Sequence, residues 1–237
     1  MTECPEYTDT PSLPASSYSV HDPNRPRPPT VEAGGPTTTA PPGDATVLFD
    51  GTGLDAWAGV DGGPAGWTVE DEYVEVDPGT GDIRTREPIG DCQLHLEWRT
   101  PAPPADDWDR GNSGVFLADR YEVQVFDGYE NAIYADGRPG AVYGQHPPLV
   151  DPCREPGAWQ SFDLVWRSPR FDGEAVVRPG RVTLLYNGVL VQDGATVYGP
   201  TAHRQSRPYE PHPTARPLRL QDHGDRVRFR NVWYREL

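Results

Sequence analysis

The chain has 237 residues and a formal net charge of −15, and all of its basic residues are arginine. A protein this acidic is repelled by phosphates, which disfavours a nucleic-acid partner and a polyanionic substrate. The absence of lysine also excludes Schiff-base chemistry.

Cysteine usage and hydropathy point to a cytoplasmic location. The three cysteines are an odd number without CxxC spacing, so neither a disulfide framework nor a cysteine zinc site is indicated. We expect Cys92 and Cys153 to be small core residues, and the sequence leaves a bridge between them open. No apolar run approaches the length of a membrane span, and residues 1–44 lack the basic start and apolar core of a signal peptide. We therefore expect no membrane partner.

The first part of the chain differs in composition from the rest. Residues 1–43 are rich in Pro, Thr, Ser and Gly, with runs such as PRPP at 26–29 and PTTTAPP at 36–42. Segments of this kind bury too little apolar surface to order themselves. We predict a disordered or wrapping Pro-rich N-terminal arm over 1–43 and one folded domain over 44–237.

From residue 46 onward the sequence predicts many short strands and no long helix. Turn signals such as Asp50-Gly51 and Asn187-Gly188 separate the strands, and the second pair favours a tight type I′ hairpin. The predicted strands cover residues 47–50, 66–69, 73–76, 92–99, 115–126, 161–166, 181–186, 189–192, 218–221 and 227–234. This spacing predicts an all-β fold, a two-sheet sandwich of jelly-roll type.

Two of these strands carry polar, chemically capable side chains on one face. Along 93–99 the apolar residues Leu94, Leu96 and Trp98 alternate with Gln93, His95, Glu97 and Arg99, and along 121–125 Glu122 and Gln124 alternate with Tyr121, Val123 and Val125. A solvated face is the simplest explanation for alternation. We favour a shared carbohydrate-facing cleft, because these acids, amides and bases can hydrogen-bond one another and a sugar.

Loops supply further candidates for substrate binding. Asn112 and Ser113 precede a glycine that permits close approach, although they could also only shape the turn. The segments 128–156 and 201–217 are too long for plain connections and contain Tyr143, Gln145 and His203. We predict that these residues line the rim of a polar ligand site.

Taken in order, several motifs resemble the 3-keto-disaccharide hydrolase family, formerly a domain of unknown function. They are LFDGTGLDAW at 48–57, GDCQLHLEWR at 90–99, GNSGVF at 111–116, YEVQV at 121–125, GQ at 144–145, PGAWQ at 156–160, GPTAH at 199–203, LQDHG at 220–224 and RFRNVW at 228–233. The resemblance covers about residues 46–237 and implies a concanavalin-like jelly roll that acts on small-molecule 3-keto-glycosides. Many relatives look exported, whereas this chain shows no signal peptide.

A 3-keto-glycoside needs one base, one enolate stabiliser and one acid for cleavage, because the ketone acidifies the proton on carbon 2 and the aglycone then leaves from carbon 1. Hydration of the resulting enone gives the free 3-keto sugar. The catalytic candidates are Glu97, His223, Arg99 and Glu122, and amide substitution of Glu97 or His223 is expected to abolish turnover.

Simpler roles stand beside these assignments. His223 could be a turn histidine, and Arg99 could only neutralise Glu97 and Glu122. His95 and Glu97 could share a divalent cation, the one cofactor that we consider, or form a structural hydrogen bond.

Two other functions are compatible with the predicted fold. The order of Glu122 and Asp127 is similar to the catalytic strand of laminarinase-type retaining glucanases, although Gln124 replaces the middle aspartate. A lectin-like binding module is the third hypothesis, since fold does not imply catalysis. The density of ionisable groups favours an enzyme. The sequence predicts neither the anomeric preference nor the oligomeric state.

Overall fold

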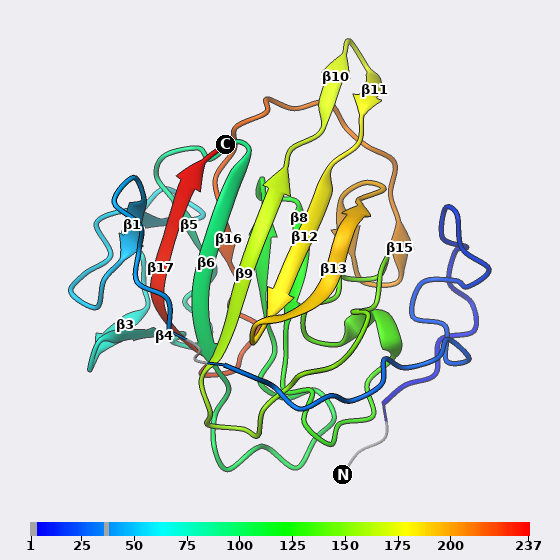
Figure 1. Ribbon diagram of the computed structural model, residues 1–237, viewed down its shortest axis with the longest axis horizontal. Coiled ribbons are helices and arrows are strands. Elements are labelled where there is room, and N and C mark those ends of the chain that lie inside the picture. The colour runs from blue at the N-terminus through cyan, green and yellow to red at the C-terminus, as the bar shows by residue number, and fades with distance from the viewer. Residues whose placement is uncertain (1–3, 36–37) are drawn as a thin grey trace.

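Two antiparallel sheets pack face to face in the computed structural model, which describes residues 4–35 and 38–237 (Figure 1). The larger sheet has the order β13-β12-β9-β6-β17-β4-β3, with β1 also paired to β17, and the smaller has the order β2-β5-β16-β7-β8. The predicted all-β, two-sheet jelly-roll sandwich is confirmed.

The larger sheet contains β1 (Thr46–Phe49), β3 (Thr68–Glu70), β4 (Tyr73–Glu75), β6 (Cys92–Arg99), β9 (Gln160–Arg167), β12 (Arg181–Tyr186), β13 (Val189–Thr196) and β17 (Arg228–Glu236). The smaller contains β2 (Trp57–Gly59), β5 (Ile83–Thr85), β7 (Ser113–Leu117), β8 (Tyr121–Val125) and β16 (Arg219–Leu220). The remaining elements are the pairs β10 (Arg170–Asp172) with β11 (Ala175–Arg178) and β14 (Thr201–Ala202) with β15 (Gln205–Ser206), and the 3-10 helix η1 (Ala135–Gly137).

The geometry of two turns explains why the predicted hairpin at Asn187-Gly188 is confirmed and why the single strand predicted over 115–126 is wrong. Asn187 and Gly188 both have positive φ, and Tyr186 pairs with Val189, as a tight hairpin requires. The single strand predicted over 115–126 is instead two strands, because Ala118 and Asp119 adopt positive φ and reverse the chain between β7 and β8. This hairpin brings residues 113–117 and 121–125 side by side.

The core lies between the two sheets and takes one face of each. Leu94, Leu96 and Trp98 of β6 are buried in the same apolar cluster as Tyr121 and Val123 of β8. Burying a side chain of this size contributes about 1.5–3 kcal/mol, so the apolar alternation fixes which face of each strand turns inward.

This shared core separates the two polar faces that the sequence suggested would meet. β6 lies in the larger sheet and β8 in the smaller one, and both direct their apolar residues into the sandwich. Their polar residues therefore point outward on opposite sides of the molecule. The expectation of one cleft lined by both Glu97 and Glu122 is wrong.

On the outer face of the larger sheet, Glu97 and His95 belong to a buried network of ionised groups. His95 Nδ1 lies 2.7 Å from Asp163 Oδ1, and His95 Nε2 lies 3.5 Å from Glu97 Oε1. Arg230 Nε donates to Glu97 Oε2 at 2.7 Å, and Asn231 Nδ2 donates to Glu97 Oε1 at 2.9 Å. Trp233 stacks on His95 with 5.2 Å between ring centroids.

The network shifts both pKa values toward the charged forms. Burial opposes ionisation of Glu97, but hydrogen bonds from His95, Asn231 and Arg230 outweigh it and lower its pKa to about 2. Burial likewise disfavours protonation of His95, yet the bonds to Asp163 and Glu97 raise its pKa. Both imidazole nitrogens thus face carboxylates, which matches a structural hydrogen bond, the alternative to a shared divalent cation that the sequence left open for His95 and Glu97. Within residues 4–35 and 38–237, no group of three or more His, Cys, Asp or Glu could hold a metal ion.

The N-terminal arm covers this network and then continues around the domain. Asn231 Nδ2 and Trp233 Nε1 donate to the carbonyl of Thr39 at 2.9 and 3.2 Å. Figure 1 shows the arm in blue, crossing one end of the larger sheet before it enters β1. Farther toward the N-terminus, Val20 is fully buried and Thr30 forms a bridge with Asp151. The described part of the arm therefore packs on the β domain.

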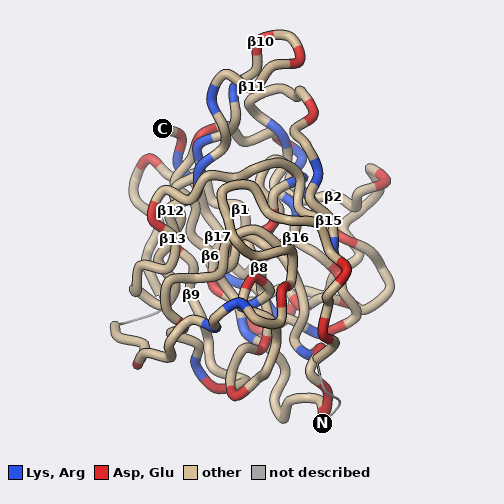
Figure 2. The backbone as a smooth tube through the Cα atoms, turned by 90° about the vertical axis from the view of Figure 1, so that its right-hand side faces the viewer, with Lys and Arg blue, Asp and Glu red and all other residues tan. Residues whose placement is uncertain are grey.

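Acidic and arginine positions are interspersed along the chain (Figure 2). Most arginines bind an acid, as Arg228 binds Glu75 and Arg235 binds Asp44. All three cysteines are free. Among the described residues, no helix has the length and apolar character that crossing a membrane requires.

Replacing Glu97 by glutamine should destabilise the fold, because the change leaves buried partners without their carboxylate. We expect a loss of roughly 3 kcal/mol at pH 7, from the shift of the Glu97 pKa between the unfolded and folded chain. Glu97 contributes to the free energy of unfolding above about pH 4.5, and this contribution is lost as the pH falls toward 2. His95 contributes below the pKa that it has in the unfolded chain, and its contribution is lost as the pH rises through its pKa in the folded protein.

Urea unfolding of the wild type and Glu97→Gln, followed by tryptophan fluorescence at pH 7 and near pH 4, measures this loss. The exposed Glu174→Gln is the matched control, with an expected change within about 0.5 kcal/mol. Equal stability of Glu97→Gln and Glu174→Gln would contradict the assignment of a structural ion network.

Candidate functional site

A cavity of about 430 Å³ opens on the outer face of the smaller sheet, a size typical of small-molecule sites. Glu122 and Gln124 of β8 form its floor, and segments from five parts of the chain, the N-terminal arm among them, form its walls. The lining residues are Tyr7, Trp108, Asp109, Asn112, Phe116, Glu122, Gln124, Phe126, Ile133, Tyr134, Tyr143, Thr201, Ala202, His203, Gln221 and His223.

Backbone hydrogen bonds attach the surrounding loops to β8. Tyr143 N donates to the Glu122 carbonyl at 3.1 Å, and Gln124 N donates to the Ala141 carbonyl at 3.0 Å. On the same strand, Glu122 N donates to Thr201 Oγ1 at 3.0 Å. The segment after β8 and the segment at β14 are therefore held beside the outward side chains of this strand.

Glu122 is the buried acid of the cavity. Its side chain lies across the neighbouring strand, where Gly114 leaves room: a Cβ on Gly114 would stand 2.6 Å from Glu122 Oε1. Burial raises the pKa of Glu122 to about 8; nearby Arg219 opposes this shift and Asp82 adds to it. Glu122 is therefore mainly protonated at neutral pH, unlike an ordinary glutamate.

Two glutamines that line the cavity have buried amide oxygens without a hydrogen-bond partner. Gln124 Nε2 donates to Asn112 Oδ1 at 3.1 Å, while Asn112 N donates to Asp225 and Asn112 Nδ2 to Asp109. Gln124 Oε1 and Gln221 Oε1 are both buried without a hydrogen-bond partner. Because buried polar atoms are normally paired, these oxygens fit a ligand that donates hydrogen bonds, such as a sugar with its hydroxyl groups.

A chain of hydroxyls and an imidazole forms the opposite wall. The Tyr134 and Tyr143 hydroxyls lie 2.9 Å apart, and Tyr143 OH lies 2.9 Å from His203 Nδ1. Partial burial, with the nearby charges of His21 and Arg204, lowers the pKa of His203. His203 is thus neutral at pH 7, and its Nδ1 is oriented by Tyr143.

The structure brings together six of the residues that the sequence indicated: Asn112, Glu122, Gln124, Tyr143, His203 and His223. Two further predicted residues, Ser113 and Gln145, lie behind the wall of the cavity. Ser113 Oγ donates to the Gln221 carbonyl at 2.7 Å, and Gln145 binds Gly199 and Tyr198 through its amide. Both position loops of the site.

The other four predicted residues lie on the far side of the sandwich. Gln93, His95, Glu97 and Arg99 project from the outer face of β6 in the larger sheet. The Arg99 guanidinium sits 4.9 Å from the Trp159 ring and 5.4 Å from the Tyr73 ring. None of these side chains can act in the same cavity as Glu122.

Sequence reasoning missed Tyr7, Trp108, Thr201 and Gln221 as lining residues. Gln221 could have been found, because it precedes His223 by two residues at the end of a predicted strand. Tyr7 carries no such signal, since it lies in a Pro-rich segment far from the rest of the site in sequence.

Asp127, the second carboxylate of the glucanase hypothesis, accepts hydrogen bonds from other residues of the protein. Arg110 Nε donates to Asp127 Oδ2 at 2.7 Å, and Tyr129 N donates to Asp127 Oδ1 at 3.1 Å. Retaining hydrolysis needs two carboxyl groups facing the scissile bond about 5 Å apart. The arrangement therefore disfavours retaining hydrolysis by Glu122 and Asp127.

Comparison with known proteins agrees with this picture. A model of the 3-keto-alpha-glucoside-1,2-lyase-like domain matches residues 44–235. A candidate glycosyl hydrolase from Parabacteroides distasonis shares 40% identity over 82% of this chain and 84% of its own, with a TM-score of 0.79. A second one from that organism, at 22% identity over 82% and 94% of the two chains and a TM-score of 0.62, shows a similar fold.

The search of curated proteins found no match. The family model nevertheless spans most of the sequence, and the first of these neighbours is well above 30% identical over most of both chains. The chain therefore belongs to the 3-keto-alpha-glucoside-1,2-lyase-like family.

Proposed function

We propose that this carbohydrate-active enzyme cleaves 3-keto-glycosides by elimination followed by hydration. Family membership and the similarity to a candidate glycosyl hydrolase support action on a carbohydrate. The observation that carries the more specific proposal is the buried Glu122 carboxyl, whose raised pKa keeps it protonated in a sugar-sized cavity lined by imidazoles and free amide oxygens.

The reaction needs a proton to leave carbon 2 and another to reach the leaving oxygen. A base removes the carbon-2 proton, which the adjacent ketone acidifies, and the enolate expels the group on carbon 1 as the C1–O bond breaks. An acid protonates that oxygen to give an alcohol and an enone. Water then adds to carbon 1 and a proton returns to carbon 2, which yields the free 3-keto sugar.

Neighbouring groups with oppositely shifted pKa values suit these two roles. Glu122, protonated at neutral pH, is the proposed acid for the leaving oxygen. His203, whose pKa is lowered and whose Nδ1 is held by Tyr143, is the proposed base through Nε2. His223 is a second imidazole on the wall and is proposed to stabilise the enolate.

Incubating the purified chain with a methyl 3-keto-glucoside and with the parent methyl glucoside tests this function. We expect cleavage of the keto compound alone, because only its carbon-2 proton is acidified by the ketone. Cleavage of both compounds would favour ordinary glycoside hydrolysis, and binding without turnover would favour a lectin-like module.

The rate on the keto substrate should follow a bell-shaped pH profile. Activity should fall above about pH 8, where Glu122 loses the proton that it donates, and on the acid side as His203 becomes protonated. Glu122→Gln should lower kcat by about 100-fold or more and remove the alkaline limb. Measuring kcat/KM from pH 5 to 10 for both proteins checks this, and an alkaline limb that persists in Glu122→Gln would contradict the acid role.

The same variant should be more stable than the wild type. The folded-state pKa of Glu122 is above its unfolded value, so unfolding free energy decreases as the pH rises from about 4.5 to 8. Removing the ionisable group should raise stability by up to roughly 3 kcal/mol at pH 7. Urea unfolding measures this gain, which has the opposite sign to the loss expected for Glu97→Gln.

Gly114→Ala tests whether the position of Glu122 matters. The new Cβ would stand 2.6 Å from Glu122 Oε1 and 2.8 Å from the Phe116 ring, so the carboxyl must move. We expect kcat/KM to fall by about 100-fold, as small displacements of catalytic groups do. Gly53→Ala, at a glycine with open space around it, is the control and should retain wild-type kinetics; equal rates for the two variants would contradict this placement.

A further inference from the structure

The proposed base, His203, lies at the tip of a short hairpin. β14 and β15 contain two residues each, and Ala202 pairs with Gln205, so His203 and Arg204 are the two residues of the turn. Both turn residues are exposed, and Arg204 has positive φ. A two-stranded hairpin is only marginally stable by itself. The orientation of the His203 ring therefore depends on contacts from other parts of the chain.

The N-terminal arm supplies such contacts. The Tyr7 ring meets the His203 ring edge-on with 5.3 Å between centroids, and the His21 ring lies 5.3 Å from it at an interplanar angle of 32°. Arg204 Nη2 donates to both carboxylate oxygens of Asp9, at 2.6 and 2.8 Å. The Arg204 guanidinium also lies 4.9 Å from the centre of the Tyr7 ring. Three arm residues thus contact the two residues of the hairpin tip.

His21 is itself held firmly. It is buried, its backbone N donates to Asp136 Oδ2 at 3.0 Å, and its Nδ1 lies 3.0 Å from Asp136 Oδ1. Its ring packs against Tyr134 and Tyr143, with 4.0 and 5.0 Å between centroids. Tyr143 is the residue whose hydroxyl orients His203 Nδ1. One fixed ring of the arm therefore stands behind both the proposed base and the tyrosine that orients it.

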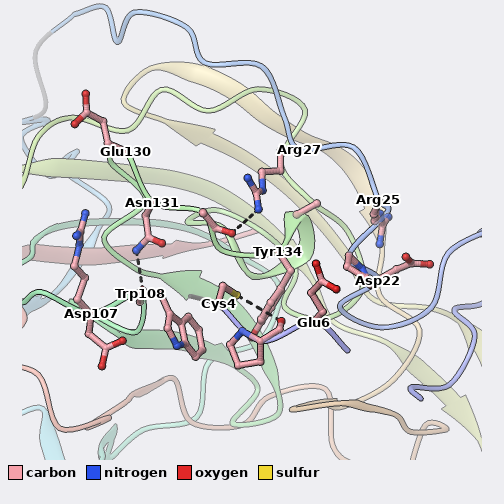
Figure 3. Close-up of a pocket in the computed structure, with 15 residues that line it drawn as sticks. Cys4, Glu6, Asp22, Arg25, Arg27, Asp107, Trp108, Glu130, Asn131 and Tyr134 are labelled. Carbon is pink, nitrogen blue, oxygen red and sulfur yellow. Dashed lines mark hydrogen bonds between the residues drawn. The ribbon is translucent and has the colours of Figure 1, made fainter. Parts of the chain in front are cut away.

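The arm is bonded to the domain again just beyond His21. Arg25 donates to the Gln145 carbonyl at 3.1 Å, and Arg27 donates to the Ala132 carbonyl at 2.6 Å. Figure 3 marks the bond of Arg27 with a dashed line, in the cavity of about 600 Å³ between the arm and the domain. The arm lies outside residues 44–235 that match the family. Its contacts with His203 are therefore additional to those that the family domain provides.

Asp9 and His21 are not among the described residues that line the Glu122 cavity. They can therefore influence a bound substrate only through the residues that they contact. We propose that Asp9 and His21 are positioning residues, which fix the hairpin tip so that the His203 imidazole is held in the orientation that proton abstraction requires. This inference rests on the proposed function and deepens it, because the complete active site then includes the arm.

The surroundings of His203 provide a readout that does not depend on turnover. The titratable and charged groups around its ring are Tyr143, Tyr7, His21, Arg204, His223 and Asp109. Partial burial is the largest cause of the lowered pKa of His203; His21, Arg204 and His223 lower it further, and Asp109 opposes them. Removing the His21 imidazole should therefore raise the pKa of His203 toward its ordinary value.

His21→Asn tests the role of the buried ring. Asparagine tolerates the positive φ of this position and its amide can still donate to Asp136, but the ring beside His203 is lost. We expect kcat for methyl 3-keto-glucoside to fall about tenfold or more with KM nearly unchanged, since small displacements of a catalytic group slow the chemical step. The acid limb of the pH profile should move to higher pH. The His203 titration, followed by NMR of the ring Cε1–H and assigned with His203→Gln, should move the same way.

Asp9→Asn tests the ion pair at the hairpin tip. Loss of an exposed pair is a small effect, so we expect kcat to fall about threefold. Asp9→Glu, which keeps the carboxylate, should retain most of the wild-type kcat. Glu32→Gln is the matched control, because it removes one exposed carboxylate of the same arm outside the Glu122 cavity, and it should behave as the wild type.

Wild-type kcat in both His21→Asn and Asp9→Asn would overturn the positioning role. A lower kcat in His21→Asn with the acid limb and the His203 titration unmoved would also overturn it, since that result marks a merely structural residue. If His21→Asn fails to fold, as judged by thermal unfolding, the comparison of Asp9→Asn with Asp9→Glu decides, and equal kcat values reject the proposal. A wild type that does not cleave the keto compound would overturn the proposed function, whereas the His203 titration would still show whether the arm acts on His203.

Discussion

The burial of one apolar face from each sheet in a single core is the constraint on which the rest of this structure depends. Side chains of a strand alternate between its two faces, so once Leu94, Leu96 and Trp98 turn inward, His95 and Glu97 must turn outward. The same rule applied to β8 sends Glu122 outward on the other side. Two polar stripes that look alike in sequence are thereby placed on opposite surfaces.

The glutamates of the two stripes differ in pKa because different polar and charged groups surround them. Glu97 receives hydrogen bonds from Arg230 and Asn231 beside His95, and its pKa falls to about 2. Glu122 is buried without such bonds, and although nearby Arg219 opposes the shift, burial raises its pKa to about 8. Identical side chains thus become a structural anion and a protonated acid, and strand periodicity alone does not distinguish them.

Much of the fold follows from local pattern, whereas the site depends on long-range packing. The Asn187-Gly188 turn and the alternation in β6 and β8 correctly predicted a hairpin and the inward faces. Which sheet each strand joins was not encoded in that alternation, and this is why Glu97 and Glu122 were wrongly placed together. The sequence also did not predict that Tyr7 lines the cavity, because Tyr7 lies in a segment without any strand or helix period and reaches the domain only through long-range packing.

The arm shows how a segment with little apolar surface can still be ordered by docking. Proline restricts the backbone of the unfolded chain, so less conformational entropy is lost when such a segment is fixed. A few buried anchors, among them Leu13, Val20 and His21, then suffice to hold it against a preformed surface. One of its regions of contact lies beside the Glu122 cavity, and another covers the Glu97 network on the opposite side through Thr39. One Pro-rich segment therefore adds a wall where a polar ligand needs contacts and a cover where buried charges must be kept from water.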